Sequence, residues 1–169
     1  MKKTIYSRRQ VLGFISASLL TANVPLFAQA ENIPVIREHD MVVAMVEKAS
    51  SAIAKYGFPN ALSRTKRELW SRPSFGLYVF VLDTEGTLLL HPDKRGGHQN
   101  VIASHDIQGT PFIRNMIHAA TDAHGVGVWT RYLWTDANSG ELGTKHTYSK
   151  AINGMIISSG YLATKGLGS

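Results

Sequence analysis

The segment from residue 77 to residue 91 constrains the fold of this chain most, because it carries the pattern of a β-hairpin. Residues 77–82 are rich in β-branched and aromatic side chains, residues 83–86 are turn-forming and end in Gly86, and residues 87–91 run back. Glycine supplies the positive φ angle that a tight hairpin turn needs. Two strands joined in this way are antiparallel, so we expect an antiparallel sheet.

Three later segments complete the predicted sheet. Residues 127–134 and 145–152 flank a loop at residues 138–140 and predict a second hairpin, and residues 155–161 predict a last strand. The polar, glycine-rich tail that follows predicts no further element. The sequence therefore predicts five strands, all joined to their neighbours as antiparallel pairs.

Helical periodicity is found in the segments between these strands. Apolar side chains recur at helical spacing over residues 37–56, and Gly57 is a stop signal. Pro59 is expected to begin a second, shorter helix that runs towards Trp70. Thr110 is expected to cap a third helix that has Pro111 at its first position. The residues expected to face the core from the first and third helices are Met41, Val42, Met45, Val46, Ala49, Ala52 and Ile53, and Phe112, Ile113, Met116, Ile117 and Ala120.

The order of these elements is helix, helix, hairpin, helix, hairpin, strand. This order predicts an α+β domain in which a long N-terminal helix packs on a five-stranded antiparallel sheet. With one face of the sheet covered by helices, we expect the second face to be free to bind a ligand or a partner.

The first thirty residues have the composition of an export signal. Lys2, Lys3 and a Ser-Arg-Arg run precede an apolar stretch, and Ala28-Gln29-Ala30 is a small-residue cleavage site. The apolar stretch is too short and too often interrupted by polar residues for a membrane anchor, which needs about 20 apolar residues. We therefore expect cleavage after Ala30 and a periplasmic domain, residues 31–169, without a membrane span. The Ser7-Arg8-Arg9-x-x-Leu12 pattern resembles a twin-arginine signal, although Sec leaders also carry adjacent arginines.

Charge and cysteine content exclude several classes of protein. Residues 1–30 hold four of the 18 lysines and arginines and none of the 12 acids, so the remaining chain has a net charge of only +2. No dense basic patch remains, which argues against nucleic-acid binding. The absence of cysteine excludes disulfides, iron–sulfur clusters, c-type haem and thiolate zinc sites.

The seven histidines and the serines do not form a recognisable catalytic or metal-binding motif. His91, His98 and His105 are spaced by seven, and His118 and His124 flank the third helix, but neither set has the spacing of a zinc site. No nucleophile elbow, phosphate loop or cofactor motif is present. We therefore expect no enzymatic activity, no catalytic residue, no cofactor and no metal.

Five motifs, in order along the chain, resemble those of the single Cache domain family. Residues 77–86 followed by Leu90-His91-Pro92 resemble its core signature. The other four motifs are Asp106-Ile107-Gln108-Gly109-Thr110-Pro111-Phe112, Tyr132-Leu133-Trp134, Lys145-His146-Thr147-Tyr148 and Ser159-Gly160-Tyr161. The resemblance covers residues 37–161. It implies a PAS-like sheet behind a long N-terminal helix, in an extracytoplasmic sensor module that binds a small ligand on the sheet.

The chain departs from the family's pattern in three respects. Cache domains usually lie between two membrane helices of a chemoreceptor or histidine kinase, whereas here we expect a cleavable leader, no second span and no signalling domain. Thr135-Asp136 follows the Tyr-x-Trp motif where a proline-rich loop is common, and Asn153-Gly154-Met155 replaces a tryptophan before the last strand. These differences leave the class of ligand open between carboxylates and amino acids.

Strand alternation and the resemblance together indicate the ligand-binding residues. Tyr132 and Trp134 share one face of their strand, and the pattern is equally compatible with a place in a pocket and a place in the core. Phe80 is assigned to the core. The resemblance implies that Lys145 is the partner of a carboxylate; without it, an exposed strand lysine would be the simpler interpretation. The remaining candidates are His91, which is equally compatible with a structural role, Tyr78, and Tyr148, which ranks lower because alternation places it opposite Lys145. Arg131 is expected to face outward.

We expect a sensor-type periplasmic Cache protein that binds a small organic molecule and presents it to a membrane receptor, histidine kinase or transporter. The ligand is expected to be a carboxylate or an amino acid. The alternative is a periplasmic accessory subunit of an enzyme or redox complex that has no ligand of its own.

Overall fold

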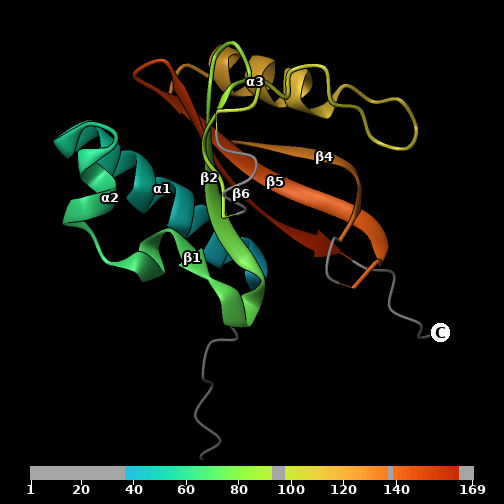
Figure 1. Ribbon diagram of the computed structural model, residues 1–169, viewed down its shortest axis with the longest axis horizontal. Helices are drawn as coiled ribbons and strands as arrows, with labels where there is room; N and C mark the ends of the chain where they lie inside the picture. Colours follow the sequence, from blue (N-terminus) through green and yellow to red (C-terminus); the bar gives the residue numbers. More distant parts are fainter. Residues whose placement is uncertain (1–36, 93–97, 137–138, 164–169) are drawn as a thin grey trace, which may run out of the picture. The chain divides into compact units, whose positions relative to one another are not determined.

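A computed structural model describes residues 37–92, 98–136 and 139–163 (Figure 1). The expected leader (residues 1–30), residues 93–97 between the first hairpin and the third helix, and the C-terminal tail from residue 164 lie outside the described residues. The helices are α1 (Glu38–Tyr56), α2 (Asn60–Arg64) and α3 (Phe112–Asp122), with short 3-10 turns η1 (Arg67–Leu69) and η2 (Pro73–Phe75). The strands are β1 (Ser71–Arg72), β2 (Leu77–Asp83), β3 (Leu88–Leu90), β4 (Val128–Thr135), β5 (Leu142–Ile152) and β6 (Met155–Ala163).

The strands form one antiparallel sheet in the order β1-β2-β6-β5-β4, and β3 pairs with β2 beside this path. The predicted fold class, a long helix packed on an antiparallel sheet, is confirmed. The structure adds β1, which is only two residues long and therefore too short to give an alternating pattern. β4 stands at the end of the order, so β5 is its one neighbour among the described strands.

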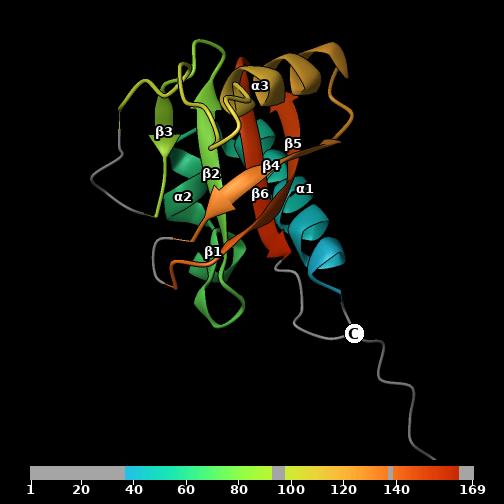
Figure 2. The same cartoon turned by 90° about the vertical axis from the view of Figure 1, so that its right-hand side faces the viewer.

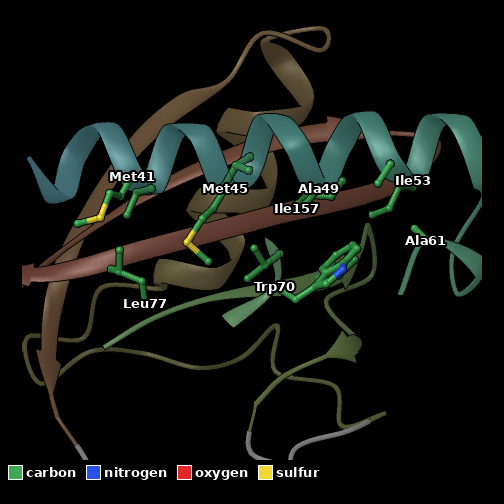
Figure 3. Packing of buried hydrophobic residues seen from close by; sticks show 13 residues of the cluster. Met41, Met45, Ala49, Ile53, Ala61, Trp70, Leu77 and Ile157 are labelled. Carbon is green, nitrogen blue, oxygen red and sulfur yellow. The ribbon is translucent and has the colours of Figure 1, made fainter. Parts of the chain in front are cut away.

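One face of the sheet packs against α1. The apolar stripe of α1 includes Met45, Ala49 and Ile53, none of which is more than 2% exposed. Figure 3 shows these side chains pointing from the helix toward Ile157 of β6. Side chains alternate along a strand, so Val81 of β2 also points toward α1 while its neighbours point away. This face is a filled hydrophobic core.

The opposite face of the sheet packs against α3 (Figures 1 and 2). Met116 of α3, Leu82 of β2 and Ile156 of β6 have no exposed surface. The expectation that the second face is free is therefore wrong. The apolar side chains of α3 must be buried, as those of α1 are. Because α1 already fills the first face of the sheet, α3 packs on the second face.

The second helix is shorter than predicted. α2 ends at Arg64, because Thr65 adopts an extended conformation with φ −123° and ψ 161°. The Thr65 hydroxyl donates to the Ala61 carbonyl at 2.7 Å and accepts from Trp70 Nε1 at 2.7 Å. Trp70 is thereby held in the α1 core, where 7% of it is exposed.

The predicted cap of the third helix is also corrected. α3 begins at Phe112, Pro111 occupies the N-cap position, and no side chain caps the helix. The backbone N–H of Thr110 donates to Asp106 Oδ1 at 2.9 Å, and the Thr110 carbonyl accepts from the Phe112 N–H at 2.8 Å. A carboxylate from the preceding loop therefore organises this start, in place of the threonine hydroxyl.

No helix among the described residues has both the length and the apolar content needed to cross a membrane.

Candidate ligand-binding pocket

A cavity of about 280 Å³ lies on the α3 face of the sheet. Strands β2 to β5, the loop before α3 and the first turn of α3 all contribute to its walls. The lining residues are mainly aromatic or aliphatic, with one lysine: Tyr78, Phe80, Leu88, His91, Val101, Ser104, His105, Phe112, Ile113, Tyr132, Trp134 and Lys145. Such walls suit a small ligand that has an apolar part and one polar group.

Lys145 is the only lysine among the described lining residues, and 7% of it is exposed. Its ammonium donates to the Tyr78 hydroxyl at 3.0 Å and lies 5.0 Å from the ring centres of both Tyr78 and Trp134. No acidic side chain pairs with it among the described residues. Burying a charge without an opposite charge is costly, so an anion placed beside this ammonium would offset part of that cost.

Tyr132 supplies a second fixed polar group. Its ring stacks on Phe112 with 4.3 Å between centroids, and 7% of the residue is exposed. Its hydroxyl accepts a hydrogen bond from Thr147 Oγ1 at 3.2 Å. Burial raises the pKa of Tyr132 well above its ordinary value, outweighing the opposite effect of the Thr147 hydrogen bond. The phenol therefore keeps its proton and remains a donor.

Two tyrosine hydroxyls of the pocket are available as donors. The hydroxyls of Tyr78 and Tyr132 each accept one bond from a neighbour, Lys145 and Thr147 respectively. A hydroxyl that already accepts has its own hydrogen left to donate. The described lining contains no carboxylate, so the site is chemically suited to an acceptor-rich group.

The structure brings together five of the six residues that the sequence indicated, Tyr78, His91, Tyr132, Trp134 and Lys145. His91 meets the Tyr78 ring edge-on, with 5.4 Å between centroids.

Tyr148 is not brought to the pocket. It lies on the α1 face, where its hydroxyl donates to Glu47 Oε1 at 3.1 Å. It is three residues after Lys145 on a regular strand, so the two side chains point to opposite faces. Arg131, expected to face outward, is exposed.

Sequence reasoning missed several parts of the site. Thr147 is fully buried beneath Tyr132, and its position two residues after Lys145 was a signal that both side chains share a face. Phe80 was assigned to the core, and it lines the pocket as well. Ser104 and His105 come from an irregular loop, where no periodic pattern exists to indicate direction.

Within the parts of the chain that the structure describes, no three His, Cys, Asp or Glu side chains come close enough together to hold a metal ion.

Comparison with known proteins gives a family match over most of the chain. The Single Cache domain 2 family matches residues 37–162, a range that spans all the elements described above except the last residue of β6. No curated protein sequence matches the chain.

Solved structures with a similar fold include chemosensory domains. A methyl-accepting chemotaxis protein from Vibrio parahaemolyticus RIMD 2210633 aligns with a TM-score of 0.58 at 18% identity, covering 73% of this chain and 87% of that one. A Cache chemosensory domain solved for the structural basis of carboxylic acid recognition aligns with a TM-score of 0.59 at 19% identity, covering 73% and 92%. The periplasmic sensor domain of a chemotaxis protein gives 0.52 at 20% identity, covering 70% and 85%. At these identities the likeness shows the fold.

Proposed function

This chain belongs to the Single Cache domain 2 family, and from that premise we propose that it binds a small carboxylate in the α3-side pocket. The protein is proposed to act in the periplasm as a sensor-type binding protein. It would present its ligand to a membrane receptor, histidine kinase or transporter.

One observation carries the proposal, namely the buried ammonium of Lys145. It is enclosed by two aromatic rings at 5.0 Å, bonded to one tyrosine hydroxyl and unpaired with any described acid. A carboxylate in this position receives a charge-assisted bond from Lys145 and neutral bonds from Tyr78 and Tyr132. Binding thereby offsets the desolvation of the lysine.

The same pocket favours a simple carboxylate over an amino acid. An amino acid carries an ammonium group that needs acceptors, and the described lining offers no acidic side chain to supply them. A second cation near Lys145 would also be repelled. Phe80, Leu88 and Ile113 instead offer an apolar wall for a short hydrocarbon tail. The cavity of about 280 Å³ restricts the ligand to a small molecule.

The periplasmic location rests on the predicted leader, which lies outside the described residues. We propose binding without turnover, because neither the sequence motifs nor the described lining forms a recognisable catalytic constellation. Recovery of the bound carboxylate unchanged after long incubation supports this, and its conversion contradicts it.

The test is a set of ligands that share one carbon skeleton. Calorimetric titration with propionate, propionamide, alanine and propylamine separates the charge of the carboxylate from its shape and from the added ammonium. We expect propionate to bind, and the other three to bind at least about ten-fold more weakly. Equal binding of propionamide contradicts the role of charge, and preferential binding of alanine contradicts the choice of ligand class. If none of a wider panel of small carboxylates binds, the proposed function is wrong.

A further inference from the structure

The loop before α3 is organised by one carboxylate that does not itself line the pocket. Asp106 Oδ1 accepts the backbone N–H groups of Gln108 and Thr110, both at 2.9 Å. The Asp106 N–H donates to the Thr110 carbonyl at 3.0 Å, and the Gly109 N–H to the Asp106 carbonyl at 2.9 Å. These bonds fold residues 106–110 into a compact turn.

The second oxygen of Asp106 makes a bond of a different kind. Oδ2 accepts the backbone N–H of Leu133 in β4 at 3.1 Å, across 27 residues of sequence. β4 is an edge strand, and the outward N–H groups of an edge strand lack a partner in the sheet. Asp106 therefore occupies a hydrogen-bonding position that a further strand would otherwise take.

This bond lies where three walls of the pocket meet. Ser104 and His105 immediately precede Asp106, and Tyr132 and Trp134 flank Leu133. Phe112, which follows the turn, stacks on Tyr132 at 4.3 Å. One carboxylate thus connects the loop wall, the start of α3 and the β4 wall.

We propose that Asp106 is a positioning residue of the ligand pocket. By accepting the Leu133 N–H, it fixes the β4 aromatic residues relative to the loop and α3, and so sets the affinity for the ligand. The expected effect on affinity rests on the proposed function, in which the pocket binds a carboxylate. Asp106 acts on that ligand through other residues and does not contact it. A binding site loses affinity when the hydrogen bonds that hold its ligand-contacting residues in place are removed.

A single substitution separates the turn from the link to β4. Asp106→Asn keeps an oxygen that can accept from Gln108 and Thr110, but its amide nitrogen cannot accept from Leu133. Asp83 offers a matched control, because its Oδ1 accepts from the Glu85 and Thr87 N–H groups at 3.0 and 2.7 Å. Among the described residues, that carboxylate bonds only within its own hairpin turn, and Asp83 does not line the pocket. Asp83→Asn therefore makes the same chemical change without a link between elements.

Two measurements on the same variants test the proposal. In the first, propionate affinity is expected to fall about ten-fold in Asp106→Asn and to stay at the wild-type value in Asp83→Asn. In the second, NMR hydrogen exchange of the Leu133 amide is expected to accelerate in Asp106→Asn alone. If Asp106→Asn folds poorly, Asp106→Ser replaces it, since its short hydroxyl keeps a turn acceptor but does not reach Leu133.

The outcomes distinguish this proposal from the proposed function. If Leu133 exchanges faster in Asp106→Asn while propionate affinity is unchanged, the positioning role is wrong and the function stands. If the wild-type protein binds no small carboxylate, the function is wrong, and the NMR signals of the Trp134 indole and the Ile113 methyl groups decide on Asp106. Shifted or broadened signals in Asp106→Asn support positioning, and wild-type signals overturn it.

Discussion

The two faces of one sheet differ in what they bury. On the α1 face, apolar side chains fill the space between helix and strands, and Ile53 and Ile157 have no exposed surface. On the α3 face, the same strands leave a cavity of about 280 Å³ around a buried lysine. The α1 face is fully packed, whereas the α3 face combines a packed core with a mainly apolar pocket that contains one buried lysine. Proteins commonly place their strained or polar features at functional sites and stabilise them elsewhere.

β5 shows how one strand serves both faces. Lys145 and Thr147 point to the α3 face, where Lys145 lines the pocket and Thr147 bonds to Tyr132. Tyr148 and Lys150 point to α1, where both bond to Glu47. Alternation along the strand is sufficient to separate the two roles. Pairs of matched substitutions on opposite faces therefore test the contrast directly.

The largest difference is expected between two helical isoleucines. Ile53→Ala in the filled core is expected to lower the free energy of unfolding by about 2–5 kcal/mol, because it leaves a cavity that cannot collapse fully. Ile113→Ala at the pocket wall is expected to cost less, since it enlarges a space that already exists. Urea denaturation measures both. Equal losses would contradict the division into a packed and a hollow face.

The two lysines of β5 form the second pair. Lys145→Met is expected to weaken carboxylate binding about 100-fold and to leave the stability unchanged or higher, because an unpaired buried charge is removed. Lys150→Met breaks a part-exposed ion pair with Glu47. We expect it to cost at most about 1 kcal/mol of stability and to leave binding intact. Calorimetric titration measures the affinity of both variants, and urea denaturation measures their stability. A loss of stability in Lys145→Met but not in Lys150→Met would refute this assignment of binding to Lys145 and stability to Lys150.

Two tyrosines on opposite faces give a smaller effect. Tyr132→Phe removes a pocket donor and is expected to weaken propionate binding about ten-fold. Tyr148→Phe removes the bond to Glu47 and is expected to lower the free energy of unfolding by about 1 kcal/mol without changing affinity. If Tyr148→Phe weakens propionate binding as much as Tyr132→Phe does, the two faces are not functionally separate.

The smallest effect concerns pH and the α1 face. Burial, and then the positive charges of Arg131 and His39, lower the pKa of His146 from its ordinary value of 6.5. The unfolded chain then takes up this proton more readily, so stability is lost as the pH falls below 6.5 and through the lowered pKa. Between about pH 7.5 and pH 5, the melting temperature of the His146→Gln variant is expected to fall less than that of the wild type. An identical loss in both proteins would show that His146 does not contribute.

The fold was predictable because its signals are periodic. The helical spacing of α1 and α3 identified the helical residues of both cores. Alternation placed Tyr132 and Trp134 on one face of β4, whereas Lys145 was indicated by the resemblance to the Cache family and not by alternation. The placement of α3 on the second face was missed, because an amphipathic pattern shows that a helix packs but not on which face. The link from Asp106 to Leu133 was missed for a different reason. A side chain that bonds to the backbone of a distant strand leaves no periodic signal.

Titration of propionate into matched lysine variants shows whether the buried ammonium of Lys145 binds a carboxylate. We expect the wild-type protein and Lys150→Met to bind propionate alike, and Lys145→Met to bind it about 100-fold more weakly. Wild-type affinity in Lys145→Met, or an equal loss of affinity in both variants, would show that the Lys145 ammonium does not hold the ligand.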